Sequence, residues 1–507
     1  MLRKFALGAV VALPVALLPV TLTVPPAAAG PDLARSVTAK DVRRHLESLQ
    51  AIAEDNGGDR AMERSGYDAS VKYVVGRLRK AGFRPAVRPF TFQRWEPRMP
   101  PVLTRVAPGE AAYQHGTDYA VIEHSGSGDV TAGVTPVDVP ADGGVGDAGC
   151  QAEDFAGFPR GNIALVQRGT CNFVVKADHA RAAGASAVVI YNRPGQGGLV
   201  RPSLEAPRPL PAVFVTREVG ADLLDAAREE TPRLRIRADS RYVRHRSSNV
   251  IADTRWGRPD NVVVVGAHLD SVPGGAGVND NGTGVAAVLA VAQKIHKLGR
   301  KQIRNRVRFA FWGAEEEGLR GSRAYVKSLP AAQRSKIALN LNFDMLGSVN
   351  GVRGVYDGDG STGSNGAKPP PGSGAIEKTF RDYYARRRLP VVETEFSGRS
   401  DYGPFIEAGI PAGGLFSGAE LKKTPEQARL FGGRAGEPYD PCYHQGCDTI
   451  GNVDWKLLDT HVDGVAFAVQ RFAGGALPVN GDVRKRARAL RAAGPGPFAW
   501  VGDRQVR

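Results

Sequence analysis

The chain has 507 residues, of which 42% are hydrophobic and 23% charged, an ordinary balance for a globular protein. A single hydrophobic core rarely serves so long a chain, so we expect two or three domains. The net charge of +15 raises the question of nucleic-acid binding. However, no aromatic residues interleave with the basic run 484–491, which argues against a nucleic-acid partner and favours a solvated tail.

The N-terminus has the pattern of a secretory signal. Arg3 and Lys4 precede an almost wholly apolar run over 5–22, and an Ala-x-Ala pattern ends at Ala29. The alternative is a membrane anchor, but the small-residue exit favours cleavage. We therefore predict a signal peptide over 1–29 and a secreted, extracellular mature chain without a membrane attachment, because no other segment approaches the ~18 apolar residues that span a bilayer.

The four cysteines fit an exported protein with two disulfides, for which three pairings are possible. Cys442 and Cys447 lie five apart and can close one short loop, which leaves Cys150 to pair with Cys171. The alternative is a zinc site built from cysteines and histidines. Such a site would favour Cys-x-x-Cys spacing and a reducing compartment.

The first elements form an α/β pattern. Apolar residues at helical spacing predict a helix over 38–54, and a second helix runs from about 68 to 81 and ends before Gly82. A strand-like segment follows at 87–92.

The composition changes near residue 97. Prolines and Gly- and Asp-rich turns lead into a strand–helix–strand passage over 161–192, with its helix at 179–185. This passage has no plausible cluster of metal ligands or catalytic bases. It resembles the protease-associated domain, a module inserted into several secreted peptidases, and we place the insertion at 97–242.

The α/β pattern resumes after the insertion. Buried-type strands are predicted at 248–252, 261–267, 307–312 and 339–343, with a helix at 284–298. Strands that alternate with helices predict a mixed, mostly parallel sheet flanked by helices. In such sheets the functional site forms at the carboxyl ends of the strands. Residues 474–507 are expected to form a basic C-terminal tail.

Metal-ligand residue types gather at these strand ends. His268, the acidic run that begins at Glu315, and Asp344 each follow a predicted strand by one to three residues. Asp280 lies in a Gly- and Asn-rich turn, and His444 lies between two cysteines. Each has a plain alternative, such as a buried histidine, a helix cap or a surface acidic run. Together, two histidines and several carboxylates are a zinc-binding set that leaves room for a water, which points to a metal-dependent hydrolase.

At these positions the chain resembles the M28 family of di-zinc aminopeptidases, and in particular the secreted Streptomyces-type enzymes. The resemblance implies a zinc exopeptidase fold with a discontinuous peptidase domain over 30–96 and 243–473. The motifs that carry it are His268-Leu269-Asp270-Ser271, the Asp280-Asn281 turn, Trp312-Gly313-Ala314-Glu315-Glu316, Asn342-Phe343-Asp344-Met345, Ser397-Gly398-Arg399-Ser400-Asp401 and Cys442-Tyr443-His444.

The resemblance also assigns roles to these residues. It implies that His268 and Asp344 bind one Zn²⁺, that Glu316 and His444 bind a second, and that Asp280 bridges the two. The pair would activate a shared water, with Glu315 as the general base that takes its proton. Tyr443 would donate to the oxyanion. Asp270 lies where it can orient the His268 imidazole, and the peptide bond after Asp280 is cis in relatives.

Substrate recognition follows from the same likeness. Glu315, Asp344 and the backbone carbonyl of Arg399 would bind the free α-ammonium of a peptide. Phe416 matches a wall of the pocket for the first side chain, which favours large hydrophobic residues. We expect a monomer that acts on peptides with free N-termini.

A possible calcium site and Glu317 each have two interpretations. Some relatives bind Ca²⁺, and the matching residues are Asp32, Asp459 and Asp463, for which ordinary solvation of a helix face is an equally good explanation. Glu317 stands where relatives commonly have an apolar residue, so it either faces solvent or changes the charge near the pocket.

Rival functions remain on the same fold. A carboxypeptidase would need a cation for the terminal carboxylate, and a glutaminyl cyclase would use one zinc. A binding protein that has lost catalysis would lack metal ligands, whereas every ligand position is filled here.

Overall fold

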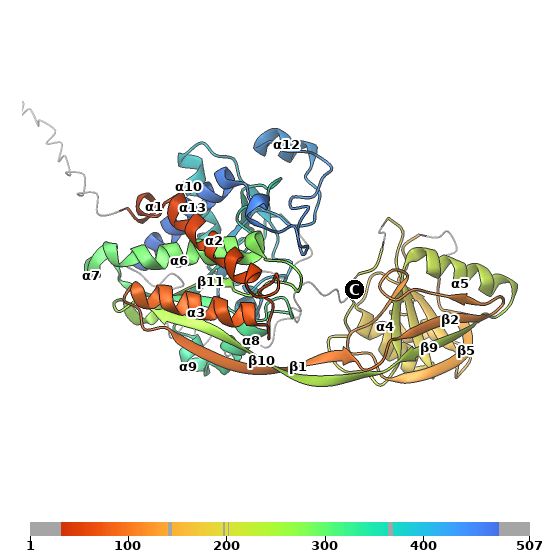
Figure 1. The fold of residues 1–507 in the computed structure, drawn as a ribbon. Helices are drawn as coiled ribbons and strands as arrows, with labels where there is room; N and C mark the ends of the chain where they lie inside the picture. Colours follow the sequence, from red (N-terminus) through yellow and green to blue (C-terminus); the bar gives the residue numbers. More distant parts are fainter. Residues whose placement is uncertain (1–31, 140–143, 196–197, 201, 363–368, 476–507) are drawn as a thin grey trace, which may run out of the picture.

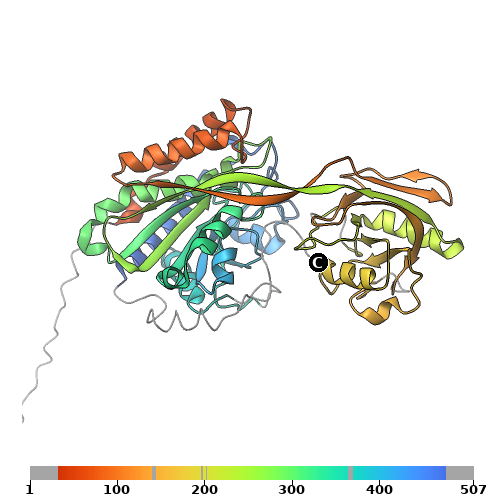
Figure 2. The same ribbon diagram turned by 90° about the horizontal axis from the view of Figure 1, so that it is seen from below.

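The structure is a computed structural model that describes residues 32–139, 144–195, 198–200, 202–362 and 369–475. Two lobes lie side by side and are joined by a long two-stranded ribbon (Figures 1 and 2). The predicted signal peptide, and the predicted tail beyond residue 475, fall outside the described residues. Among the described helices, none combines the length and apolar character needed to cross a membrane.

The larger lobe contains an eight-stranded mixed sheet. Its strands lie in the order β1 (Ala86–Pro97), β10 (Ser240–Asp253), β12 (Asn305–Trp312), β11 (Arg258–His268), β13 (Ile337–Phe343), β16 (Ala412–Phe416), β14 (Gly354–Tyr356) and β15 (Val392–Thr394). The central strands β12, β11, β13 and β16 pair in parallel. β11 is buried from Asn261 to its end at His268, and β13 is buried throughout, because both faces are covered by helices. The predicted α/β class and mostly parallel central sheet are confirmed.

Helices cover both faces of this sheet. One face packs against α2 (Ala39–Glu54), α3 (Ser65–Lys80), α6 (Gly284–Ile295), α10 (Ser373–Arg386) and α13 (Trp455–Gly474). The other packs against α8 (Arg320–Ser328) and α11 (Gly403–Glu407). The helix α6 is apolar on all sides because it is buried between the sheet and its neighbours. The short helices are α1 (Leu33–Ser36), α7 (Gly299–Gln302), α9 (Ala331–Arg334) and α12 (Pro425–Phe431).

The smaller lobe has its own eight-stranded sheet. The order is β3 (Ala111–Ala112), β2 (Val102–Ala107), β9 (Arg233–Ala238), β5 (Gly128–Pro136), β6 (Ile163–Gln167), β7 (Ala187–Tyr191), β8 (Ala212–Val215) and β4 (Tyr119–Val121). The helices α4 (Phe173–Ala182) and α5 (Arg217–Glu229) complete it. Helix α4 begins six residues before the predicted start because Phe173 and Ala177 pack into the core. A disulfide joins Cys150 and Cys171.

The ribbon that joins the lobes consists of β1 and β10. These strands pair antiparallel from Ala86 opposite Ile251 to Pro97 opposite Ser240. Both predicted boundaries of the insertion, 97 and 242, therefore lie at the far end of the ribbon. The sequence predicted only the first half of β1, because the charged residues Arg94 and Glu96 interrupt the apolar alternation of its second half.

Candidate active site

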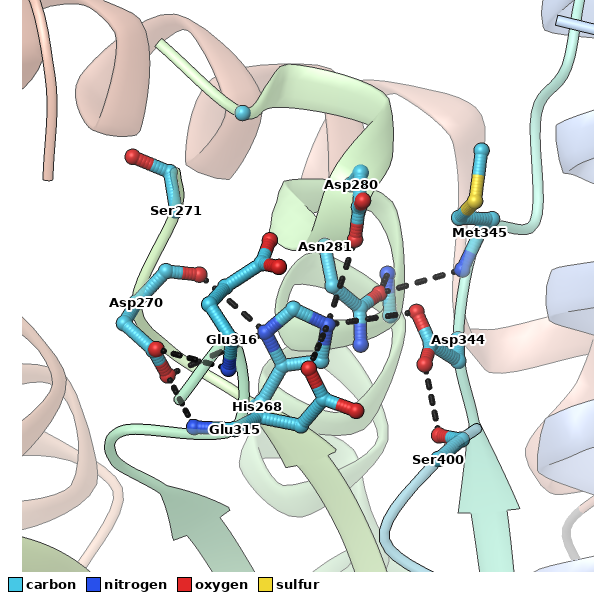
Figure 3. A network of polar contacts seen from close by, with 12 residues as sticks. His268, Asp270, Ser271, Asp280, Asn281, Glu315, Glu316, Asp344, Met345 and Ser400 are labelled. Carbon is cyan, nitrogen blue, oxygen red and sulfur yellow. Dashed lines mark hydrogen bonds and ion pairs between the residues drawn. The ribbon is translucent and has the colours of Figure 1, made fainter. Parts of the chain in front are cut away.

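The parallel strands deliver the predicted ligands to one edge of the sheet. His268 ends β11, Asp344 follows β13 directly, and Glu315 and Glu316 follow β12 in a short turn. Asp280 comes from the distorted turn Val278–Thr283 that leads into α6. His444 reaches the same place from a loop before α13. Figure 3 shows how His268, Asp280, Asp344 and the two glutamates point toward one another.

The five predicted ligands form two groups that share Asp280. His268 Nε2 lies 3.2 Å from Asp280 Oδ1 and 3.3 Å from Asp344 Oδ1. His444 Nε2 lies 3.2 Å from Asp280 Oδ2 and 3.1 Å from Glu316 Oε2. The donor atoms within each group of three lie within 4.8 Å of one another. One carboxylate therefore offers one oxygen to each of two cation positions.

The buried carboxylates of this cluster favour bound cations. Glu316 Oε1 is buried and accepts no hydrogen bond, and Asp344 Oδ1 faces the His268 imidazole at 3.3 Å. Burial without a hydrogen bond is costly for a carboxylate oxygen unless a cation pairs with it. Burial opposes the charged imidazoles, yet Asp344 and Glu315 hold the pKa of His268 well above its ordinary value, and Glu316 and Asp280 raise the pKa of His444 to about 10. Two imidazoles with carboxylates are a donor set that fits zinc.

Two buried side chains fix the ligand carboxylates. Ser400 Oγ donates to Asp344 Oδ2 at 2.5 Å and accepts from Asn342 Nδ2 at 2.7 Å. The carboxylate of Asp448 accepts the backbone N–H groups of Asn279 at 2.7 Å and Asp280 at 2.9 Å. Such supporting hydrogen bonds set the direction in which a ligand points. The peptide bond between Asp280 and Asn281 is cis, as the family resemblance implied.

Asp270 acts differently from the expectation. The His268 ring is oriented by the backbone carbonyl of Asp270, 3.1 Å from Nδ1, whereas the nearer carboxylate oxygen is 3.8 Å away. The carboxylate instead accepts the backbone N–H groups of Glu315 and Glu316, each at 3.2 Å (Figure 3). The side chain of Asp270 therefore holds the acidic turn, and its main chain orients the histidine.

Arg60 supports the site and has no counterpart in the predictions. Its fully buried guanidinium donates to the carbonyl oxygens of Leu269, Ala276 at 2.9 Å and Gly277 at 2.7 Å. It thereby ties the segment after His268 to the segment before Asp280. In the sequence, Arg60 lies in a polar turn between two helices, a place where an arginine is usually solvated, so no local signal marks it.

Tyr443 and Arg399 lie together at the edge of the ligand cluster. Arg399 Nη2 donates to Tyr443 Oη at 3.1 Å, and Nη1 donates to Glu420 Oε1 at 2.5 Å. A disulfide between Cys442 and Cys447 closes the loop that carries Tyr443 and His444. The sequence predicted a role only for the backbone carbonyl of Arg399, in substrate binding. The structure shows that the Arg399 guanidinium also donates to the Tyr443 hydroxyl.

An open cavity of about 570 Å³ adjoins the ligand cluster. The expected residue Phe416 lines it, together with Val352, Tyr356 and Tyr402. Tyr356 stacks on Phe396 with ring centroids 5.0 Å apart. Sequence reasoning missed Tyr356 because it is a lone aromatic residue in a short strand, without a motif of its own.

The predicted calcium residues lie apart from this site. Asp459 and Asp463 lie on α13, and Asp32 caps α1, which packs against α13. Burial and the neighbouring Asp459 raise the pKa of Asp463 to about 6. Among the described residues, these three are not one of the acidic groups whose oxygens converge within 4.8 Å.

Comparisons with known proteins agree with the fold. The model of Peptidase family M28 matches residues 249–469, and that of the PA domain matches 130–223. An aminopeptidase of Pseudomonas aeruginosa is 45% identical over 445 residues, which is 86% of this chain and 81% of the relative. A probable leucine aminopeptidase 2 of Aspergillus fumigatus is 38% identical over 412 residues, 80% of this chain and 78% of the relative.

A solved structure extends the likeness. The zinc aminopeptidase of Bacillus subtilis has a TM-score of 0.57 and 26% identity, covering 85% of this chain and 94% of that one. Fold and site together define a metallo-exopeptidase. The chain belongs to peptidase family M28, with a PA domain in its smaller lobe.

Proposed function

We propose that this protein is a secreted di-zinc aminopeptidase that removes N-terminal residues, with a preference for large hydrophobic ones. The observation that carries the proposal is Asp280, whose two oxygens face two separate ligand pairs. His268 and Asp344 would hold one zinc, and Glu316 and His444 the other. When bound, the two ions would lower the pKa of a water toward neutrality and polarise the substrate carbonyl.

Glu315 would move the proton of that water. Its Oε2 lies 3.9 Å from His268 Nε2, inside the ligand cluster, and its backbone is held by Asp270. A carboxylate in that position takes a proton as general base and returns it to the nitrogen of the leaving amine.

Tyr443 would stabilise the carbonyl oxygen as it gains negative charge. Its hydroxyl oxygen accepts from Arg399 Nη2 at 3.1 Å, so its own proton can be donated. The free α-ammonium of the substrate would meet the carboxylates of Glu315 and Asp344 and the carbonyl of Arg399. This recognition restricts hydrolysis to the N-terminal residue.

The first side chain of the substrate would enter the cavity beside the zinc ligands. Aromatic rings of Tyr356 and Phe416 line it, which favours residues such as leucine. Each methylene contributes only ~1–3 kcal/mol of discrimination, so the preference is expected to be broad.

The central experiment is chelation and zinc add-back, with rates measured on Leu-, Lys- and Asp-p-nitroanilides. We expect two zinc ions per chain, loss of activity on chelation, recovery with zinc, and the highest kcat/KM for leucine. An N-acetylated leucine substrate should be inert. A protein that binds no zinc, or that cleaves the blocked substrate as fast as the free one, would overturn the proposal.

Three further parts of the proposal have direct tests. Mass spectrometry of the exported protein should give an N-terminus at Gly30, and light scattering should give a monomer. Calcium at Asp32, Asp459 and Asp463 should raise the Tm at millimolar concentration, since extracellular calcium sites work at about 10⁻⁴–10⁻³ M. Asp463→Asn should abolish that shift.

A further inference from the structure

The turn that carries Glu315 and Glu316 is held from two directions. It closes on itself, because the N–H groups of Gly318 and Leu319 both donate to the Glu315 carbonyl, at 2.7 and 2.8 Å. On the sheet side, the Asp270 carboxylate accepts two of its N–H groups. The other side of the turn faces the β1–β10 ribbon, and Glu317 contacts the ribbon.

Glu317 is bound by the ribbon through an ion pair. Arg94 of β1 donates from Nη1 to Glu317 Oε1 at 2.9 Å, and the two side chains are only 32% and 19% exposed. The carbonyl of Glu317 accepts from Arg320 Nε at 2.8 Å, and the Arg320 guanidinium lies 5.2 Å above the ring of Phe92, also on β1. Glu317 is therefore neither solvent-facing nor directed into the substrate cavity.

Arg94 is itself fixed within a charged network. Its Nη2 donates to Glu96 Oε1 at 2.6 Å. The buried ring of His245 on β10 joins Glu96, at 2.8 Å, to Glu63 of the peptidase lobe, at 2.7 Å. The guanidinium is thus held in one place before it meets Glu317.

The opposite face of the same ribbon contacts the inserted lobe. Trp95 and Tyr242 are register partners, next to Arg94 and on the other face, because successive side chains alternate along a strand. Trp95 Nε1 donates to the Ser125 carbonyl at 3.3 Å, and the Tyr242 hydroxyl lies 2.7 Å from His124 Nδ1. Figures 1 and 2 show the ribbon running from one lobe to the other.

We propose that Arg94 is a positioning residue for Glu315, and that the inserted lobe sets through the β1–β10 ribbon how firmly the catalytic turn is held. This inference rests on the proposed function, in which Glu315 is the base. Without Arg94, the partly buried Glu317 carboxylate would lose its cation and repel its neighbours Glu315 and Glu316. The turn would move outward, and displacements of about 1 Å at a reacting group cost up to about a hundred-fold in rate.

The first experiment compares Arg94→Met, Arg94→Lys, Glu317→Gln and the double variant R94M/E317Q at saturating zinc. We expect R94M to lower kcat about ten-fold and R94K to recover part of the loss, because lysine keeps the charge. The double variant should be no slower than R94M, since it leaves no unpaired carboxylate at position 317 of the turn. A double variant that shows the product of the two single losses, or an R94M rate equal to that of the wild type, would overturn the inference.

A matched control is Arg235→Met. Arg235 pairs with Asp129 in the inserted lobe at 2.8 and 2.9 Å, and this pair is far more exposed. This variant makes the same arginine-to-methionine change as R94M, at a site away from the ribbon. We expect its rate to match that of the wild type, and a loss equal to that of R94M would count against a specific role for Arg94.

A second readout does not use activity. Amide hydrogen exchange of zinc-free protein should speed up at residues 313–320 in R94M. It should also speed up there in Trp95→Phe/Tyr242→Phe, which removes the two polar contacts with the inserted lobe but keeps an aromatic ring at each position. Faster exchange confined to residues 123–125 in that double variant would overturn the coupling to the inserted lobe. Because this comparison needs no zinc or turnover, it can fail or succeed independently of the proposed function.

Discussion

Ser400→Ala tests whether buried supports of the ligands control metal affinity. The substitution removes one oxygen, which donates to Asp344 Oδ2 at 2.5 Å and accepts from Asn342 Nδ2 at 2.7 Å. The residue is 4% exposed, so water cannot readily replace the lost donor. The effect should therefore fall on the zinc that we propose His268 and Asp344 to hold, and spare the one that we propose for Glu316 and His444.

The expected size follows from the single hydrogen bond to a charged acceptor. Such a bond contributes about 1.5–3 kcal/mol. At 1.36 kcal/mol per ten-fold change, that is about 10- to 150-fold weaker binding of one zinc. The range overlaps the ~10–100-fold losses typical when the partner of a metal ligand is removed.

The assay is competition of zinc-free protein with a chromophoric chelator, which resolves the two binding steps. Ser70→Ala is the matched control, because Ser70 is equally buried and its hydroxyl donates to the Gly66 carbonyl within α3, outside the site. We expect S70A to keep both zinc affinities. Unchanged affinities in S400A, or equal losses in S70A and S400A, would refute the reasoning.

Three more predictions follow from the same site and core. Glu315→Gln should lower kcat about 10²–10⁴-fold with zinc retained, measured on Leu-p-nitroanilide and by metal analysis, because it removes the base. Tyr443→Phe should lower kcat about 10²–10³-fold with little change in KM, as expected for a donor to the oxyanion. A variant with a raised KM and an unchanged kcat would contradict that role. Burial lowers the pKa of His461 to about 4. Between pH 6.5 and 4, the unfolded chain therefore binds a proton at this histidine and the folded chain does not. The free energy of unfolding should therefore fall by about 3 kcal/mol between pH 6.5 and 4, and His461→Asn should reduce this pH dependence. The measurement is thermal unfolding of metal-free protein over that pH range.

Local sequence patterns were sufficient for the elements that carry the site. Helical spacing predicted α2 to within one residue, and the apolar runs predicted the central strands β11, β12 and β13 to within two or three residues, whereas β16 was not predicted. The ends of β11 and β13 then placed His268 and Asp344, because a parallel sheet brings its carboxyl ends to one edge. The ligand set was readable because each ligand sits in a short motif beside a strand or turn.

Contacts that join distant segments had no such signature. Arg60 reaches carbonyl groups 209–217 residues away, and Arg94 meets Glu317 across 223 residues. An arginine in a polar turn or a half-exposed strand looks the same in sequence whether it is solvated or buried. For Asp270, the sequence predicted that the side chain would orient the His268 imidazole, whereas the backbone carbonyl does so. The path of the two-residue turn decides which oxygen faces the histidine.

The chain by itself thus determined the fold class, the inserted module and the candidate zinc ligands, since these depend on periodicity and on motifs of a few residues. Only the tertiary structure decided which buried polar groups hold those ligands and how the ribbon links the inserted lobe to the catalytic turn. The physical reason is that hydrogen bonds and ion pairs are short-ranged. Their partners are chosen by packing in three dimensions and leave no periodic trace along the chain.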